Sequence, residues 1–153
     1  MIQRIQTIYL FVASILLLIT SLLPISYIID STQHVVITIY ALKVEINNSI
    51  STTKSVLTTG ILMYLAIIFS FLTIFLYKNR KLQILISSLL MVISFLICNL
   101  IVVNSYILVP STQAVMSFNY IAIFPLISLI LFFLAYRAIK KDDKLVKSLD
   151  RIR

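Results

Sequence analysis

The sequence predicts an all-α membrane protein, in which a four-transmembrane-helix bundle carries a small β-rich extracytoplasmic cap and a C-terminal cytoplasmic amphipathic helix. Hydrophobic residues make up 61% of the 153 residues and charged residues 12%, whereas charged residues are about 25% of an average soluble domain. Four apolar runs are each long enough to cross a bilayer, which takes about 20 residues in helical form. Most Lys and Arg residues flank these runs on one side, which predicts the orientation of the bundle.

The four predicted spans form a single membrane domain over residues 1–153, and none of them contains a charged residue or a histidine. The first run follows Arg4, and we expect it to remain as a helix because it is long for a signal peptide and lacks a clear small-residue cleavage site. Pro24 is expected to end a span, whereas Pro125 lies inside one and predicts a kink. The spans are residues 5–25, 57–77, 82–103 and 118–136.

The distribution of Lys and Arg predicts that both termini are cytoplasmic. Eleven of the 13 lie before the first run, between the second and third, or in the tail 137–153. The opposite side, residues 26–56 and 104–117, holds Lys43 and Lys54. Cytoplasmic loops carry the excess of basic residues, and four spans return the chain to the side where it began. The link "KNRK" is so short that the second and third helices must be antiparallel neighbours.

The outer loop 26–56 predicts a small sheet. Residues 32–46 are rich in β-branched and aromatic side chains on both faces of an extended chain, so a strand there needs cover or pairing. "NNS" at 47–49 is a turn signal that also matches a glycosylation sequon, and 50–57 would return as a second strand. Residues 106–109 add a short β-prone piece, which predicts a two- or three-stranded cap. The alternative for 32–46 is a reentrant or interfacial helix.

The basic tail predicts a separate short helix. Its apolar residues have nearly helical spacing, but Asp142 would interrupt the apolar stripe if the fourth span continued. We therefore expect a break, and an amphipathic helix over about 143–152 that is N-capped by Asp142 or Asp143. Such a helix suits anionic lipid headgroups, a protein partner, or a role as a topology anchor alone. Despite a net charge of +8, the tail is too short for nucleic acid to be an expected partner.

The residues that catalysis or metal binding would need are scarce. With one Gly and one His, the chain has no Gly-rich phosphate loop and no Ser-His-Asp or Cys-His arrangement, so we expect no enzyme and no cofactor. Asp30, Gln33 and His34 would form at most a weak polar cluster at the outer interface. A metal site needs several convergent ligands, so no metal is expected.

Two residues inside the third run have two interpretations each. Cys98 is expected to be a small packing residue and not a redox centre. Asn99 is expected to make an interhelical hydrogen bond with Ser70, Ser94 or Ser128, although an intramembrane polar residue can also mark a transport pathway. Serines and threonines in the runs are expected to replace glycine as the small residues that let helices approach.

Three stretches together resemble one family. The opening "MIQRIQTIYL", the turn "NRKLQ" and the ending "AYRAIKKDDKLVKSLDRIR" are similar to the DUF4293 family, small four-helix membrane proteins of Bacteroidota. The resemblance implies a bacterial inner-membrane location and no assigned activity. It directs attention to a polar set that the predicted topology places on the cytoplasmic face as a docking surface: Gln3, Arg4, Gln6, Arg80, Gln83, Arg137, Asp143, Lys144, Leu145, Ser148, Leu149, Asp150 and Arg151.

These observations favour a non-catalytic accessory or scaffold subunit. Its partners would be the lipid bilayer with anionic headgroups and a protein of a membrane complex or of the cytoplasm, bound through the basic cytoplasmic face. One alternative is a small transporter or channel whose path passes Asn99. Another is a protein that handles lipid or quinone in a groove open to the bilayer.

Overall fold

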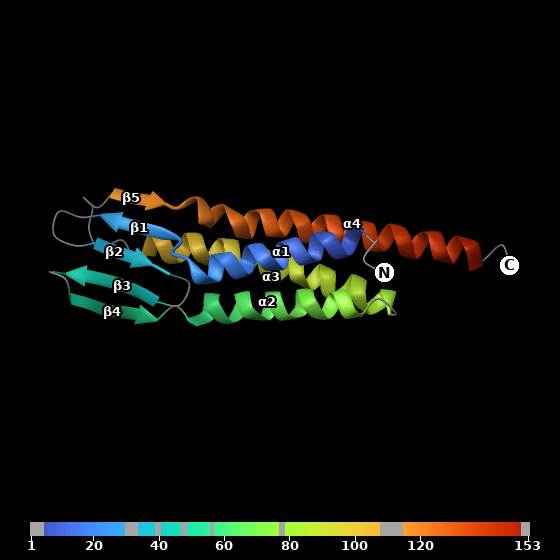
Figure 1. The fold of residues 1–153 in the computed structure, drawn as a ribbon, viewed down its shortest axis with the longest axis horizontal. Helices are drawn as coiled ribbons and strands as arrows, with labels where there is room; N and C mark the ends of the chain where they lie inside the picture. Colours follow the sequence, from blue (N-terminus) through green and yellow to red (C-terminus); the bar gives the residue numbers. More distant parts are fainter. Residues whose placement is uncertain are drawn as a thin grey trace.

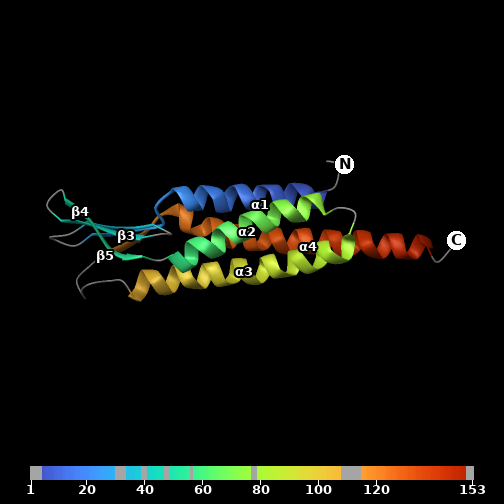
Figure 2. The ribbon, with the colours of Figure 1, turned by 90° about the horizontal axis from the view of Figure 1, so that it is seen from below.

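A computed structural model describes residues 5–29, 34–38, 41–46, 49–55, 57–76, 79–107 and 115–150 of the chain. The molecule is an elongated helical bundle with a sheet at one end and the C-terminus at the other (Figures 1 and 2). We call the first the sheet end and the second the open end. The helices are α1 (Ile5–Leu22), α2 (Leu57–Phe75), α3 (Arg80–Ile107) and α4 (Phe124–Asp150), with a 3-10 turn η1 (Tyr120–Ile123) before α4.

The prediction of four membrane-crossing helices is confirmed. All four are long and apolar enough to span a bilayer. Helix α1 packs against α2 and α4, and α3 packs against the same two helices from the other side. Large apolar side chains such as Phe95 and Ile130 are exposed on the outer faces, as expected where lipid and not water surrounds the protein.

Small and hydroxyl side chains hold the helices together, as the sequence predicts. The Ser70 hydroxyl donates to the carbonyl of Leu10 at 2.9 Å and joins α2 to α1. The Ser128 hydroxyl donates to the carbonyl of Ala13 at 3.3 Å and joins α4 to α1. Each such bond within a membrane contributes about 0.6 kcal/mol on average. Together with buried alanines, these hydroxyls allow the backbones to approach closely.

The expectation for Asn99 is wrong. Its side-chain amide donates to the carbonyl of Phe95, one turn earlier in α3, at 2.8 Å, and the residue is exposed on the outer face. The bond from α3 to α4 comes instead from Ser94, whose hydroxyl donates to the carbonyl of Pro125 at 3.3 Å. A polar amide on a lipid-facing position satisfies one donor within its own helix, so it needs no partner helix.

Helix α4 corrects two further predictions. Pro125 lies in its first turn, where the missing backbone N–H costs no helical bond, and therefore no mid-span kink is needed. The helix then continues without a break through Asp142 to Asp150, so the separate tail helix predicted from about residue 143 is wrong. Asp142 lies beyond the apolar span, where a carboxylate does not disturb a lipid-facing stripe.

The sheet is larger than the predicted two or three strands. It comprises five antiparallel strands in the order β4-β3-β2-β1-β5. Strand β1 follows α1 and lies between β2 and β5, so it joins the strands of residues 34–55 to the strand of residues 115–118. The strands are β1 (Ser26–Ile29), β2 (His34–Ile37), β3 (Ala41–Ile46), β4 (Ser49–Ser55) and β5 (Val115–Phe118).

The predicted single strand at 32–46 is instead a pair, because β2 folds back onto β3 with His34 opposite Glu45 and Ile37 opposite Leu42. A strand apolar on both faces gains pairing by turning back on itself. The alternative of an interfacial helix there is therefore wrong. Strand β4 is the returning strand expected near 50–57. Of the β-prone piece at 106–109, residues 106 and 107 end α3, and 108–109 lie outside the described residues.

Candidate functional site

The predicted docking surface separates into parts with different surroundings. Gln3, Arg4 and Arg151 lie outside the described residues. Ser148, Leu149 and Asp150 belong to the last turns of α4. The structure describes the side chains of the remaining members, which are Gln6, Arg80, Gln83, Arg137, Asp143, Lys144 and Leu145.

Gln6 and Gln83 are not on the surface, and this corrects the prediction. Each is only 2% exposed. The reason is helical phase: Gln6 shares a face with Leu10 and Ala13, at steps of four and three residues, and all three are buried. Gln83 likewise precedes the buried Ser87 by one turn. The two amides therefore form part of the helix interface.

The two glutamines lie at one level of the bundle, near the open end. Ser70 on α2 bonds to Leu10 on α1, so Gln6, one turn before Leu10, lies near Thr73 of the antiparallel α2. The Gln83 amide nitrogen donates to the carbonyl of Thr73 at 3.2 Å. The Oε1 atoms of both glutamines are buried with no hydrogen-bond partner in the described structure. This polar layer is internal and presents nothing to a docking protein.

Arg80 joins α3 to α4 at the open end. It begins α3, and its guanidinium donates to the carbonyl of Asp142 on α4 at 3.0 Å. A charged donor makes a stronger bond than a neutral one. Arg80 thus fixes the point at which α4 leaves the bundle, and in the projecting turns beyond it α4 has no neighbouring helix in either view (Figures 1 and 2).

Arg137 and Lys140 lie back along α4 toward the apolar span. The Arg137 guanidinium carbon is 5.8 Å from the centre of the Phe133 ring. The Lys140 ammonium nitrogen is 5.5 Å from the centre of the Tyr136 ring and donates to its hydroxyl at 3.4 Å. Long basic side chains whose charge sits at the edge of an apolar belt are typical of membrane interfaces.

The projecting turns of α4 combine exposed lysines with exposed apolar residues. Lys141 and Lys144 are exposed, while Asp143 is half-buried. Leu145 is 54% exposed and Val146 is 37% exposed. Val146 was not among the residues of the predicted docking surface. No other described part of the chain combines exposed apolar and basic residues on a helix that projects from the bundle.

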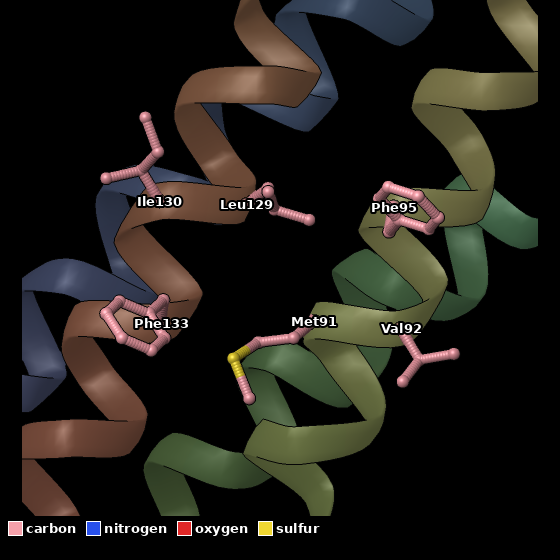
Figure 3. A pocket seen from close by; sticks show the side chains of 6 residues that line it. All are labelled: Met91, Val92, Phe95, Leu129, Ile130 and Phe133. Carbon is pink, nitrogen blue, oxygen red and sulfur yellow. The ribbon is translucent and has the colours of Figure 1, made fainter.

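Grooves along the outer surface were missed by the sequence analysis. One lies between α3 and α4 and has a volume of about 440 Å³ (Figure 3). In this view Met91 and Leu129 extend into the space between the helices. No periodicity marks the groove, because its residues have the same apolar character as any lipid-facing position. Its lining is wholly apolar: Met91, Val92, Phe95, Leu129, Ile130 and Phe133.

The same seam between α3 and α4 continues toward the sheet end in a second groove of about 490 Å³, lined by Cys98, Asn119 and Tyr120 among others. Cys98 is half-buried there. A third groove of about 400 Å³ lies between α1 and α2, where the rings of Phe11 and Phe71 meet edge to face at 6.4 Å.

The residues of the predicted outer polar cluster are only partly described. His34 lies in β2 opposite Glu45, and Asp30 and Gln33 fall outside the described residues. Within the described ranges, no three His, Cys, Asp or Glu residues gather where they could hold a metal ion.

A family model described as Domain of unknown function (DUF4293) matches residues 2–152, nearly the whole chain. The chain belongs to the DUF4293 family. No protein of curated function matches it. The match spans the four helices and the five-stranded sheet. The four helices that are long and apolar enough to cross a membrane make this DUF4293 member a multi-pass membrane protein.

Proposed function

We propose that this DUF4293 protein is a non-catalytic accessory or scaffold subunit of a bacterial inner membrane, and that the projecting end of α4 binds a larger membrane complex or a cytoplasmic protein. The observation that carries the proposal is the exposure of Leu145 and Val146 on turns that extend past the rest of the bundle. Apolar residues exposed side by side outside the membrane are typical of protein contact sites.

The proposal includes the orientation of the chain. In the sequence, eleven of the 13 Lys and Arg residues lie before α1, at the link between α2 and α3, or after Tyr136, and two lie in residues 26–56. By the positive-inside rule, the open end with both termini is cytoplasmic and the sheet is extracytoplasmic. The projecting turns of α4 then lie in the cytoplasm, where a soluble protein or the cytoplasmic domain of a complex can reach them.

The exposed apolar and basic side chains on the projecting turns indicate what kind of surface the partner should have. Lys141 and Lys144 are exposed beside Leu145 and Val146. A helix with an apolar strip and basic flanks fits a groove with an apolar floor and acidic rims. The partner is therefore expected to present such a groove. Asn99 gives no support to a transport pathway, because it faces outward and bonds to its own helix.

Site-specific cross-linking in intact cells tests the proposal. A photoreactive amino acid at Leu145 is expected to give an adduct with one protein of discrete mass. The matched control is Ile8, which is 51% exposed against 54% for Leu145 but lies in α1, a helix without charged residues. It is expected to give lipid adducts only. A smear of proteins at both positions, or no protein adduct at Leu145, would contradict the proposal.

Purification in mild detergent supplies the second arm. The cross-linked protein is expected to co-purify at a fixed ratio with the unmodified chain. Replacing Leu145 and Val146 by Ser should remove it, whereas Lys54→Gln at the sheet end should not. Retention of the same protein by the doubly substituted chain would mean that the projecting turns are not its binding site.

A further inference from the structure

We infer that the seam between α3 and α4 is a binding site for one anionic phospholipid, with an acyl chain in the apolar groove of Figure 3 and the phosphate held by basic residues at the open end. The groove supplies the first part of the evidence. Its six lining residues are apolar and it opens on the lipid-facing surface of two helices (Figure 3). An occupant of the groove must therefore be a hydrocarbon chain or another apolar group.

Basic residues continue the same helix faces toward the open end. On α4, Ile130 and Phe133 line the groove, and Arg137 follows Phe133 by one turn on the same face. The contact between the Arg137 guanidinium and the Phe133 ring shows that the charge lies next to the groove lining. Lys141, exposed, follows Arg137 by a further turn. Two cations therefore lie in line with the groove.

Helix α3 brings a third cation to the same seam. Steps of three and four residues lead from Phe95 and Val92, which line the groove, through Ser88 to Lys81 in the first turn of the helix. Lys81 is exposed. The bond from Arg80 to the carbonyl of Asp142 shows that the first turn of α3 lies against this part of α4. Lys81 and Lys141 thus face the seam from its two sides.

The distances fit a phospholipid whose headgroup is at the open end. Ile130 lies seven residues from Arg137, about 10 Å deeper along the helix. An acyl chain that leaves a phosphate near Arg137 therefore passes Phe133 and reaches the groove within one leaflet. Neither Arg137 nor Lys141 has an acidic partner among the described residues, so their charges are available to a phosphate.

The positions of the basic side chains indicate in which leaflet the bound phospholipid lies. The second groove on this seam has Asn119 and Tyr120 but no basic residue in its lining, so it offers no site for an anionic headgroup. Basic pockets between transmembrane helices are typical sites for anionic lipid headgroups. The occupant is thus an anionic phospholipid of the leaflet at the open end.

Native mass spectrometry tests the selectivity. The full chain is purified in detergent and mixed with equal amounts of phosphatidylglycerol and phosphatidylcholine of the same acyl chains. One phosphatidylglycerol is expected to be retained in preference. The variant R137Q/K141Q should lower this preference about 25-fold, on the order of 5-fold for each charge. The variant K43Q/K54Q, which removes the same charge at the sheet end, should leave it unchanged.

Cross-linking tests the acyl chain without altering the protein. A phosphatidylglycerol with a photoreactive group midway along one chain is expected to label residues 91–95 and 129–133, and inorganic phosphate at millimolar concentration should not displace it. Labelling spread over all four helices would overturn the inference. Equal effects of the two charge variants, or displacement by inorganic phosphate alone, would overturn it as well.

Discussion

The two ends of the bundle satisfy their backbones in different ways. At the sheet end, β1 is paired on both sides and the five strands bond one another in the order β4-β3-β2-β1-β5. At the open end, α4 satisfies its own backbone as a helix and projects without a neighbour (Figures 1 and 2). A sheet must gather strands to complete its hydrogen bonds, whereas a helix can leave the bundle alone. The exposed apolar and basic side chains on the projecting turns are the ones that we propose bind another molecule.

Breaking the sheet should give the largest effect. Ile28 lies in β1, which pairs with β2 on one side and with β5 on the other. Its backbone N–H therefore faces a neighbouring strand whichever side it points to. Ile28→Pro is expected to destabilise the sheet by about 2–4 kcal/mol. The rate of trypsin cleavage measures this loss of stability, because Lys43 and Lys54 are the cleavage sites in residues 26–56. Cleavage at these sites should be faster in the variant.

The matched control for this change is Thr53→Pro. Strand β4 is at the edge of the sheet, and the register passes from Lys54 opposite Leu42 to Thr52 opposite Lys43, so Thr53 occupies a bulge. Proline is tolerated at edges and bulges, and cleavage should stay slow. Equal cleavage of both variants would mean that the observed register is not the one in solution.

Replacing the buried glutamines should give the next largest effect, and it should raise the stability of the bundle. Gln6 holds a buried Oε1 with no partner, so Gln6→Leu is expected to stabilise the bundle by about 1–2 kcal/mol. Gln83→Leu should gain less, because it also loses the bond to the Thr73 carbonyl. Unfolding in mixed detergent micelles measures both. A loss of stability in Gln6→Leu would show that another group bonds this amide.

Arg80 should have a smaller effect at the open end. Arg80→Gln removes the charged donor to the Asp142 carbonyl and is expected to cost about 1 kcal/mol of unfolding free energy. Arg137→Gln is the control, since its guanidinium carbon lies 5.8 Å from the centre of the Phe133 ring, and a loss of about 0.5 kcal/mol is expected. The same micelle titration compares them, and a larger loss for Arg137 would reverse the assigned roles.

Removal of the projecting turns should change stability least. A chain ending after residue 143 keeps the Arg80 bond to Asp142 and should unfold within about 0.5 kcal/mol of the full chain. Thermal unfolding followed by circular dichroism in detergent measures this. Marked destabilisation would show that the projecting turns pack onto the bundle, which is incompatible with their proposed role in binding a partner.

The sequence predicts the membrane-spanning helices better than it predicts the sheet. Apolar length alone defines a span, so α2 and α3 begin within two residues of their predicted starts. Strand β1 was missed because Ser26 to Ile29 follows directly on an apolar run and carries no strand signal separable from it. Pairing of β2 with β3 depends on contacts between segments, which alternation along one segment cannot reveal.

The sequence predicted which polar residues gather at the open end, but not which of them are buried. Gln6 and Gln83 were assigned to the surface because the family resemblance directed attention to them and the predicted topology put them on the cytoplasmic face, yet their spacing from Leu10 and Ser87 places them inward. Helical phase would have revealed this if it had been extended to the span ends. The groove beside Phe133 could not be predicted, because it depends on how α3 and α4 cross.

The unbroken course of α4 makes it a lever. It is 27 residues long, about 40 Å of continuous helix, and Arg80 holds it where it leaves the other three. With that contact as pivot, a tilt of about 10° in the membrane would swing the tip at Asp150 by about 2 Å in the opposite direction. Bilayer thickness and lateral pressure would thereby be converted into a displacement of the projecting turns, which we propose bind a partner, without any hinge in the chain.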